Sequence, residues 1–502
     1  MKYLTRTTSA LILAGVVALL GGCGKNENGV RLVYRADSID PAALDTSKQT
    51  LEQPQVAVDS DVKALAAQYD AEHAKKAAPV AASLPAAKPA PALPAPLAAK
   101  ADIDAAKKRV QELRGSVKTA KNGAIIDLRV ESADTTVDDM KLFAKLLDLE
   151  SVFFLGNTFV DDYFTDFGAL KNLKSITIQN ADITVKTLEV FATLPELTQL
   201  DIRRDLKLEN ADLAVVAAMP KLEELHAYYN SFTNSGANKI SKSTTLKIVD
   251  LRGCQDISDS AAKYLARMAT LEEAYFRFGI SNDGVENLAA APALKFVELQ
   301  DCLIDGTCAA SLAKFPALTG LRVFRSKGFD DAGAKGIADL KLERLELRDL
   351  NVTNEGLLAL KGMTTLREVE ISELPIDSAA LNEICASWKD LTSLNFFSVP
   401  VSDEVVATIA ANMPNLKTLT LRAAVGKLTD STIDQVLKMQ NLETLDLRDN
   451  ADFSIDSMMR LAQLKNLRKI YVKGTAMGDS SEAVKAKLAE FKKAAPKCAI
   501  SL

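Results

Sequence analysis

The sequence predicts an α/β solenoid of about fifteen short repeats, with parallel strands on a concave face and helices on the convex face. Three observations predict it. An apolar pattern written L-x-x-L-x-L recurs at spacings of 23 to 26 residues, a helix-capping residue usually follows each copy, and a segment with helix-like apolar period comes next. One strand–helix unit cannot bury its apolar face, whereas a stack of such units can.

The first residues have the form of an export signal. Lys2 and Arg6 give the start of the chain a positive charge. Residues 10–20 then form an apolar run that is too short to span a bilayer. The run ends on Leu-Gly-Gly-Cys at 20–23, which resembles a bacterial lipobox. This resemblance implies a signal peptide over 1–22 and lipid attachment at Cys23. In sorted lipoproteins an aspartate after the lipidated cysteine signals retention in the inner membrane. Because Gly24 is at this position here, the resemblance implies the outer membrane of a bacterial cell envelope. The alternative is an ordinary secretory signal with an incidental cysteine.

A lipid-anchored, flexible tether is predicted over 23–100. Its second part consists largely of Ala, Lys and Pro, with six prolines between positions 79 and 96. Proline at this density favours an extended, semi-rigid spacer. A cap is predicted next, over 101–124, with a helix from Ile103 to Val117 and a hairpin turn at Asn122-Gly123.

The repeats are predicted over 125–479, beginning at Ile125, with a C-terminal cap over 480–502. The clearest copies are 246–251 and 442–447. Capping pairs such as Thr353-Asn354 and Ser402-Asp403 predict where helices begin, for example a helix over 403–412. Parallel strands lie about 4.8 Å apart. Helices are wider than strands, so the helices must lie outside and the stack must curve.

The repeat resembles the leucine-rich-repeat family, in particular the 24-residue type found in bacterial lipoproteins. The resemblance covers 103–502 and implies a ladder of Asn or Cys side chains eight residues after each repeat start. Members of this column that fit the ladder are Asn157, Asn230, Cys254, Cys302 and Asn450. Leu350, Leu374 and Val399 depart from it, which puts an unbroken ladder in doubt.

The cysteines after Cys23 show no CxxC pair and no zinc-like spacing. Cys254 and Cys302 share one column two repeats apart, about 10 Å by strand spacing, which exceeds the reach of a disulfide. Buried, unreactive thiols are therefore expected. They are Cys254, Cys302, Cys308, Cys385 and Cys498.

Residues two, four and six positions after each repeat start are expected on the concave surface, because side chains alternate along a strand. Between the fifth and tenth repeats these positions hold aromatic residues and arginines, which are enriched in the cores of protein interfaces. We interpret them as one contiguous ligand-binding patch, with exposed rings and with arginines available to anions of a partner. The patch, called the concave patch below, consists of His226, Tyr228, Arg252, Tyr275, Arg277, Phe296, Arg322, Phe324 and Arg348. The alternative is a solvated sheet face whose arginines pair with acids on neighbouring strands.

Composition and motifs favour binding over catalysis. Acidic and basic residues nearly balance, 66 against 61, which argues against a general nucleic-acid binder. Only two histidines occur and the common catalytic motifs are missing, so neither enzyme, cofactor nor metal site is expected. We predict a monomer, held at the membrane by its N-terminal lipid, that binds a protein or peptide. The alternatives are a structural scaffold of the cell envelope and a carbohydrate-binding surface protein.

Overall fold

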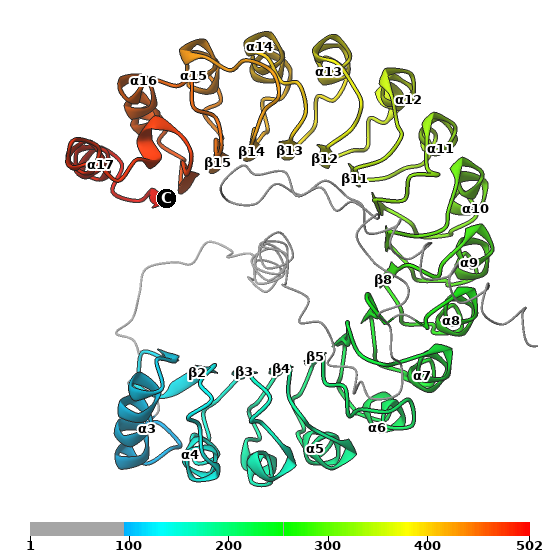
Figure 1. The fold of residues 1–502 in the computed structure, drawn as a ribbon, viewed down its shortest axis with the longest axis vertical. Coiled ribbons are helices and arrows are strands. Elements are labelled where there is room, and N and C mark those ends of the chain that lie inside the picture. The colour runs from blue at the N-terminus through cyan, green and yellow to red at the C-terminus, as the bar shows by residue number, and fades with distance from the viewer. Residues whose placement is uncertain (1–94, 255) are drawn as a thin grey trace, which may run out of the picture. The chain divides into compact units, whose positions relative to one another are not determined.

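The repeated apolar triplets form the strands of a curved solenoid, with the helices on its outer side (Figure 1). The computed structural model describes residues 95–254 and 256–502. The predicted signal peptide, Cys23 and nearly all of the predicted tether lie outside these residues. The arrangement of parallel strands inside and helices outside confirms the predicted fold class.

The described residues form one seventeen-stranded sheet in which β2 to β17 are parallel, while β1 is antiparallel to β2. The strands are β1 Ser116–Thr119, β2 Ile125–Val130, β3 Ser151–Leu155, β4 Ser175–Gln179, β5 Gln199–Arg203, β6 Glu224–His226, β7 Ile248–Asp250, β8 Glu273–Arg277, β9 Phe296–Gln300, β10 Gly320–Phe324, β11 Arg344–Arg348, β12 Glu368–Ser372, β13 Ser393–Phe397, β14 Thr418–Thr420, β15 Thr444–Asp446, β16 Lys469–Tyr471 and β17 Ala499–Ser501. Neighbouring strands pair at equivalent repeat positions, so each position forms a column across the sheet.

The helices are short because each needs to cover only one strand. They are α3 Lys100–Glu112, α4 Val137–Phe143, α5 Val185–Phe191, α6 Leu213–Ala217, α7 Asn234–Ile240, α8 Asp259–Leu265, α9 Asn282–Leu288, α10 Ala309–Leu312, α11 Asp331–Ile337, α12 Asn354–Ala359, α13 Ser378–Cys385, α14 Asp403–Asn412, α15 Asp430–Val436, α16 Ile455–Met459 and α17 Glu482–Ala494. Short 3-10 segments are η3 Asp161–Tyr163, η4 Phe167–Ala169, η5 Gly306–Cys308, η6 Leu360–Gly362, η7 Arg460–Gln463 and η8 Ala476–Gly478. The predicted caps Thr353 and Ser402 each accept a backbone hydrogen bond at the start of a helix, and α14 spans 403–412 as predicted.

The cap helix is shorter than the sequence predicts. Helix α3 ends at Glu112, and Val117 lies in strand β1 instead of in the helix. Arg114 adopts a left-handed conformation with φ 58°, and Gly115 is packed so closely that a Cβ atom would lie 2.4 Å from the Arg129 carbonyl oxygen. The chain therefore has to leave the helix here. The predicted turn is present, with Gly123 at φ +89° between β1 and β2.

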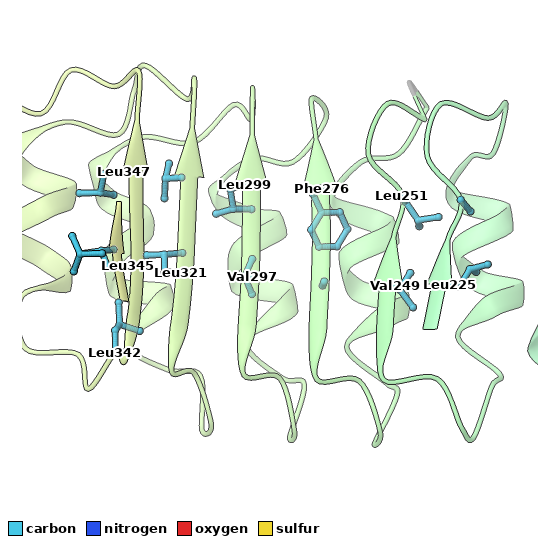
Figure 2. Packing of buried hydrophobic residues seen from close by; sticks show 14 of the residues in the cluster. Leu225, Val249, Leu251, Phe276, Val297, Leu299, Leu321, Leu342, Leu345 and Leu347 are labelled. Carbon is cyan, nitrogen blue, oxygen red and sulfur yellow. The ribbon is translucent and has the colours of Figure 1, made fainter. Parts of the chain in front are cut away.

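The core is one continuous layer between strands and helices (Figure 2). It is built from the apolar triplet positions and from the inner faces of the helices. Side chains labelled in Figure 2 include Leu225, Val249, Leu251, Phe276, Val297 and Leu299, all at most 1% exposed. Each repeat contacts mainly its neighbours, as expected of a solenoid.

The column eight residues after each repeat start lies inside the loops that follow the strands. Asn230 and Asn450 donate their amide hydrogens to loop and strand carbonyls of their own and the preceding repeat. Leu350, Leu374 and Val399 are buried apolar residues in the same column. The ladder is therefore interrupted where the sequence departs from the family pattern.

Candidate partner-binding face

The concave patch lies on strands β6 to β11 and in the residues that follow β6 and β7 directly. Strand register places its members in three columns of the sheet. One column runs through His226, Tyr275 and Arg322, and a second through Arg277, Phe324 and Arg348. Phe296 lies in the third column, next to Gly320. The structure thus brings the predicted residues onto one face.

Arginines of the patch pair with carboxylates of the same face. Arg252 lies 2.7 Å from Asp250 on its own repeat and 2.8 Å from Glu298 two strands away. Arg322 lies 3.4 Å from Glu298 and 3.0 Å from Glu346. These acids belong to the column of His226. The pairing that the sequence offered as an alternative to ligand binding is therefore present in the centre of the patch.

The two other patch arginines pair with acids at the rim. Arg277 donates to Asp301 at 2.7 Å, and Arg348 donates to Glu373 at 2.7 Å. Asp301 directly follows β9, and Glu373 directly follows β12. Arg277 and Arg348 remain partly exposed, so their outer surfaces face the interior of the arc.

The expectation of exposed rings is wrong for three of the four aromatic residues. Tyr275 is 2% exposed, Phe296 5% and Phe324 3%. The rings of Tyr275 and Phe296 contact one another at a centroid distance of 5.4 Å, and the Arg348 guanidinium lies 4.7 Å from the Phe324 ring. Guanidinium groups are weakly hydrated and stack on aromatic faces. Such stacking covers rings that an isolated strand would leave open.

Tyr228 is the ring that keeps part of its surface exposed. The Arg203 guanidinium lies 4.5 Å from its centroid and the Arg252 guanidinium 5.7 Å. Burial raises the pKa of the Tyr228 hydroxyl above its usual range, and the nearby Asp201 carboxylate adds to this effect. The hydroxyl therefore stays protonated and can donate a hydrogen bond.

The side chain of His226 is 1% exposed and lies between two carboxylates. Its Nδ1 atom lies 3.7 Å from Asp250 and its Nε2 atom 3.7 Å from Glu224. Burial alone would lower its pKa, but the two carboxylates outweigh burial and raise the pKa to about 9. At neutral pH the side chain is an imidazolium ion. It acts as a fixed cation of the face and cannot serve as a general base.

A hollow at the rim escapes the sequence analysis. It has a volume of about 610 Å³ and lies beside the loops that follow β3 to β7. Arg204 and Tyr229 line it, with the guanidinium 5.0 Å from the ring centroid, and Leu206 is 61% exposed there. Tyr229 also accepts a hydrogen bond of 2.8 Å from Arg277, which joins the hollow to the concave patch.

The direction of the rim side chains depends on an unusual backbone conformation. Arg204, Tyr229 and Phe278 have φ of 57°, 59° and 74°, and each lies seven residues after a repeat start. Non-glycine residues rarely adopt this left-handed region. The signal that could have found the hollow is the exposed aromatic or basic residue at this seventh position.

The described residues contain no group of three or more His, Cys, Asp or Glu side chains arranged to hold a metal ion. The five described cysteines are buried and free, as expected. Burial raises the pKa of Cys254 to about 12 and of Cys308 to about 12, so these thiols are unreactive. In the described part of the chain no helix is long and apolar enough to cross a membrane.

Comparison with protein families agrees with this fold. A family model described as "Leucine Rich repeat" matches residues 242–266, which contain the whole of β7 and α8. No curated protein matches the chain.

Among solved structures, the chain is similar to one in the yeast Rad7 and Elc1 complex, at 15% identity over 84% of this chain and 94% of that one, with a TM-score of 0.45. It is also similar to an internalin of Listeria monocytogenes, at 17% identity over 82% and 97% with a TM-score of 0.34. An LRR protein of Leptospira interrogans shows 16% identity over 72% and 92% with a TM-score of 0.29. Sequence identities and TM-scores this low give no information about the binding partners of this chain. By its fold, the described part of the chain is a leucine-rich-repeat solenoid.

Proposed function

We propose that this chain is an exported, lipid-anchored bacterial protein that binds a protein or peptide partner through its concave face. The observation that carries the proposal is the concave patch itself. Six successive strands present arginines and aromatic rings that are held in fixed positions by ion pairs and stacking. A rigid surface loses little conformational entropy when it binds, which favours affinity.

The partly exposed members of the patch identify where contact begins. Tyr228 and the four arginines of the patch retain accessible surface, and the hollow beside Tyr229 adds a recess with an exposed Leu206. Arg204 forms no ion pair within the described residues, so this cation can pair with a carboxylate of the partner. A partner segment that carries both acidic and apolar side chains fits this combination.

The partner is tested by crosslinking in live cells followed by mass spectrometry of captured proteins. Photo-crosslinkers are placed at Tyr228 and Arg348, and a matched crosslinker at Arg460 on the convex side serves as control. We expect one protein to be captured by the crosslinkers at Tyr228 and Arg348 and not by the crosslinker at Arg460. That capture should fall at least tenfold in an Arg204→Ala, Arg277→Ala double variant. Equal capture from both sides would contradict the proposal, and an empty result with strong glycan-array binding would favour carbohydrate recognition.

Membrane attachment rests on the lipobox resemblance at Cys23 and has its own test. Cells grown with a labelled fatty acid should transfer the label to the full chain, which should sediment with membranes. A Cys23→Ser variant should lose both properties while a Cys498→Ser variant keeps them. Labelling that persists in Cys23→Ser would exclude attachment at this residue.

A further inference from the structure

Several polar side chains of the buried column eight residues after each repeat start share one kind of hydrogen bond. Four of them donate to the carbonyl oxygen of the apolar residue five positions after the start of the preceding repeat, whereas Cys302 and Thr475 donate to carbonyls of their own repeat. The donors and acceptors are Asn230 to Ile202 at 2.8 Å, Cys254 to Ala227 at 3.3 Å, Ser326 to Leu299 at 3.3 Å and Asn450 to Leu421 at 2.7 Å. Four side chains of three chemical types thus all act as donors here.

Asp205 occupies this column in the repeat before Asn230. Its side chain is 0% exposed. Its Oδ1 atom accepts a hydrogen bond of 2.7 Å from the Ala181 backbone, as the Oδ1 atoms of Asn230 and Asn450 accept from backbone N–H groups in their preceding repeats. Its Oδ2 atom has no hydrogen-bond partner within the described residues. The carboxyl group therefore reproduces the accepting half of the asparagine pattern and lacks the donating half.

The missing donor indicates the protonation state. By the register of β4 and β5, the carbonyl that Asp205 should reach is that of Ile178, the partner of Ile202 in the sheet. If Asp205 were ionised, its Oδ2 atom and the Ile178 carbonyl oxygen would both be hydrogen-bond acceptors without a donor, in a site without solvent. Such an arrangement is energetically costly. We propose that Asp205 is held as a neutral carboxylic acid whose Oδ2–H group donates to the Ile178 carbonyl, so that it replaces an asparagine in the ladder and makes this repeat sensitive to pH.

The surroundings favour the neutral form. Charged groups of the adjoining strand and loops are Asp201, Arg203, Asp182, Arg204 and Lys207. Asp201 is paired with Arg203, and Asp182 lies 2.9 Å from Lys207, so the nearby cations are engaged or turned toward the rim. Burial, opposed by the Ala181 hydrogen bond and assisted by the Asp201 and Asp182 charges, raises the pKa of Asp205 to about 8.

The position of Asp205 links this protonation to the hollow. Four residues that line the hollow adjoin Asp205 in sequence or bond to it, namely Ala181, Arg204, Leu206 and Asn230. Loss of the proton would weaken the contact that holds the 204–206 loop against β4. The shape of the hollow should therefore change as the pH rises.

The test compares the wild-type chain with Asp205→Asn in denaturant titrations between pH 4 and pH 9. Because the folded pKa lies above the unfolded value of about 3.9, the folded state binds the extra proton and this contribution to stability decreases as pH rises between these values. The wild-type unfolding constant should increase relative to the variant by as much as tenfold per pH unit, and the difference should level off above about pH 8. Glu209→Gln, at an exposed acid further along the loop after β5, should keep the wild-type pH dependence.

A second measurement does not depend on variant folding. In chain labelled with 13C at aspartate carboxyls, the infrared carbonyl band of a protonated carboxylic acid should persist at pH 6 and vanish by pH 10. The band should be missing from Asp205→Asn. A wild-type chain without this band at pH 6, or an Asp205→Asn variant with an unchanged pH profile, would overturn the proposal.

Discussion

At the residue scale, the concave face depends on small residues that leave room for large ones. Gly320 lies beside Phe296 in the sheet, and a Cβ atom there would meet the Phe296 ring at 2.6 Å. The ring therefore lies across the neighbouring strand because the glycine permits it. Phe296 can be predicted on the concave face from its repeat position, whereas the role of Gly320 cannot, since a contact between adjacent strands has no local pattern.

Replacing Gly320 should displace the Phe296 ring. Gly320→Ala is expected to destabilise the fold by about 1–3 kcal/mol, the usual cost of overpacking. Gly362→Ala is the matched control, because nothing lies within 4 Å of a Cβ atom at that position. Denaturant unfolding of both variants measures the difference, and equal stabilities would contradict the close packing described here.

His226 provides a second residue-scale prediction. Its pKa of about 9 lies above the ordinary value of 6.5, because Asp250 and Glu224 outweigh burial. The stabilisation is therefore complete below about pH 6.5 and is lost as pH rises through 9, at up to about 1.4 kcal/mol per pH unit. In an Asp205→Asn background, which removes the titration of Asp205, His226→Gln should flatten the decline in unfolding free energy between pH 6.5 and 9. A decline of unchanged slope would exclude His226 as its source.

At the element scale, the helices are linked by their first residues. The residue that begins one helix bonds the capping residue of the next. Asp259 accepts from the Ser281 backbone and hydroxyl, whereas Asn282 donates to the carboxylate of Asp305. Where the next cap can donate, an acid or an amide is present, as Asn234 is before Ser258, whereas an amide is present where the next cap is itself an acid, as Asn354 is before Asp377. Two adjacent carboxylates are avoided.

This pairing rule predicts that Asn282→Asp is harmful and Asp259→Asn is tolerated. The first change loses donor bonds of 2.8 Å to Asp305 and to Thr307 and places two carboxylates together. It should lower the unfolding free energy by about 1–3 kcal/mol at pH 7, with partial recovery when the carboxyls are protonated near pH 3. The second change keeps an acceptor for Ser281. Thermal unfolding of both variants tests the rule, which fails if they lose the same stability.

At the scale of the whole described solenoid, stability depends on contacts between neighbouring repeats, so its ends need covering. Helix α17 covers the last repeat through Val484, Leu488 and Phe491, and β17 pairs with β16. Phe491 is 0% exposed. The last repeat therefore has a partner on both sides.

Removing the Phe491 ring should loosen one end of the solenoid. Phe491→Ala is expected to cost about 3–5 kcal/mol locally, while the neighbouring exposed change Glu490→Ala should cost little. Hydrogen exchange should show the loss of protection at β16 and β17 and full protection at β3 and β4. Uniform loss along the chain would show that the repeats unfold as a single unit.

The sequence by itself determined the repeat, its length, the order of strand and helix within a repeat and the columns in which the concave residues lie. These follow from local rules, since apolar period, capping residues such as Thr353 and alternation along a strand act within one repeat. Tertiary structure alone decided that Tyr275 and Phe324 are covered, that Arg252 reaches Glu298 two strands away, and that Arg204 and Tyr229 frame a hollow. Those outcomes depend on contacts between residues about 24 to 48 positions apart and on left-handed loop residues, and neither leaves a pattern within a single repeat.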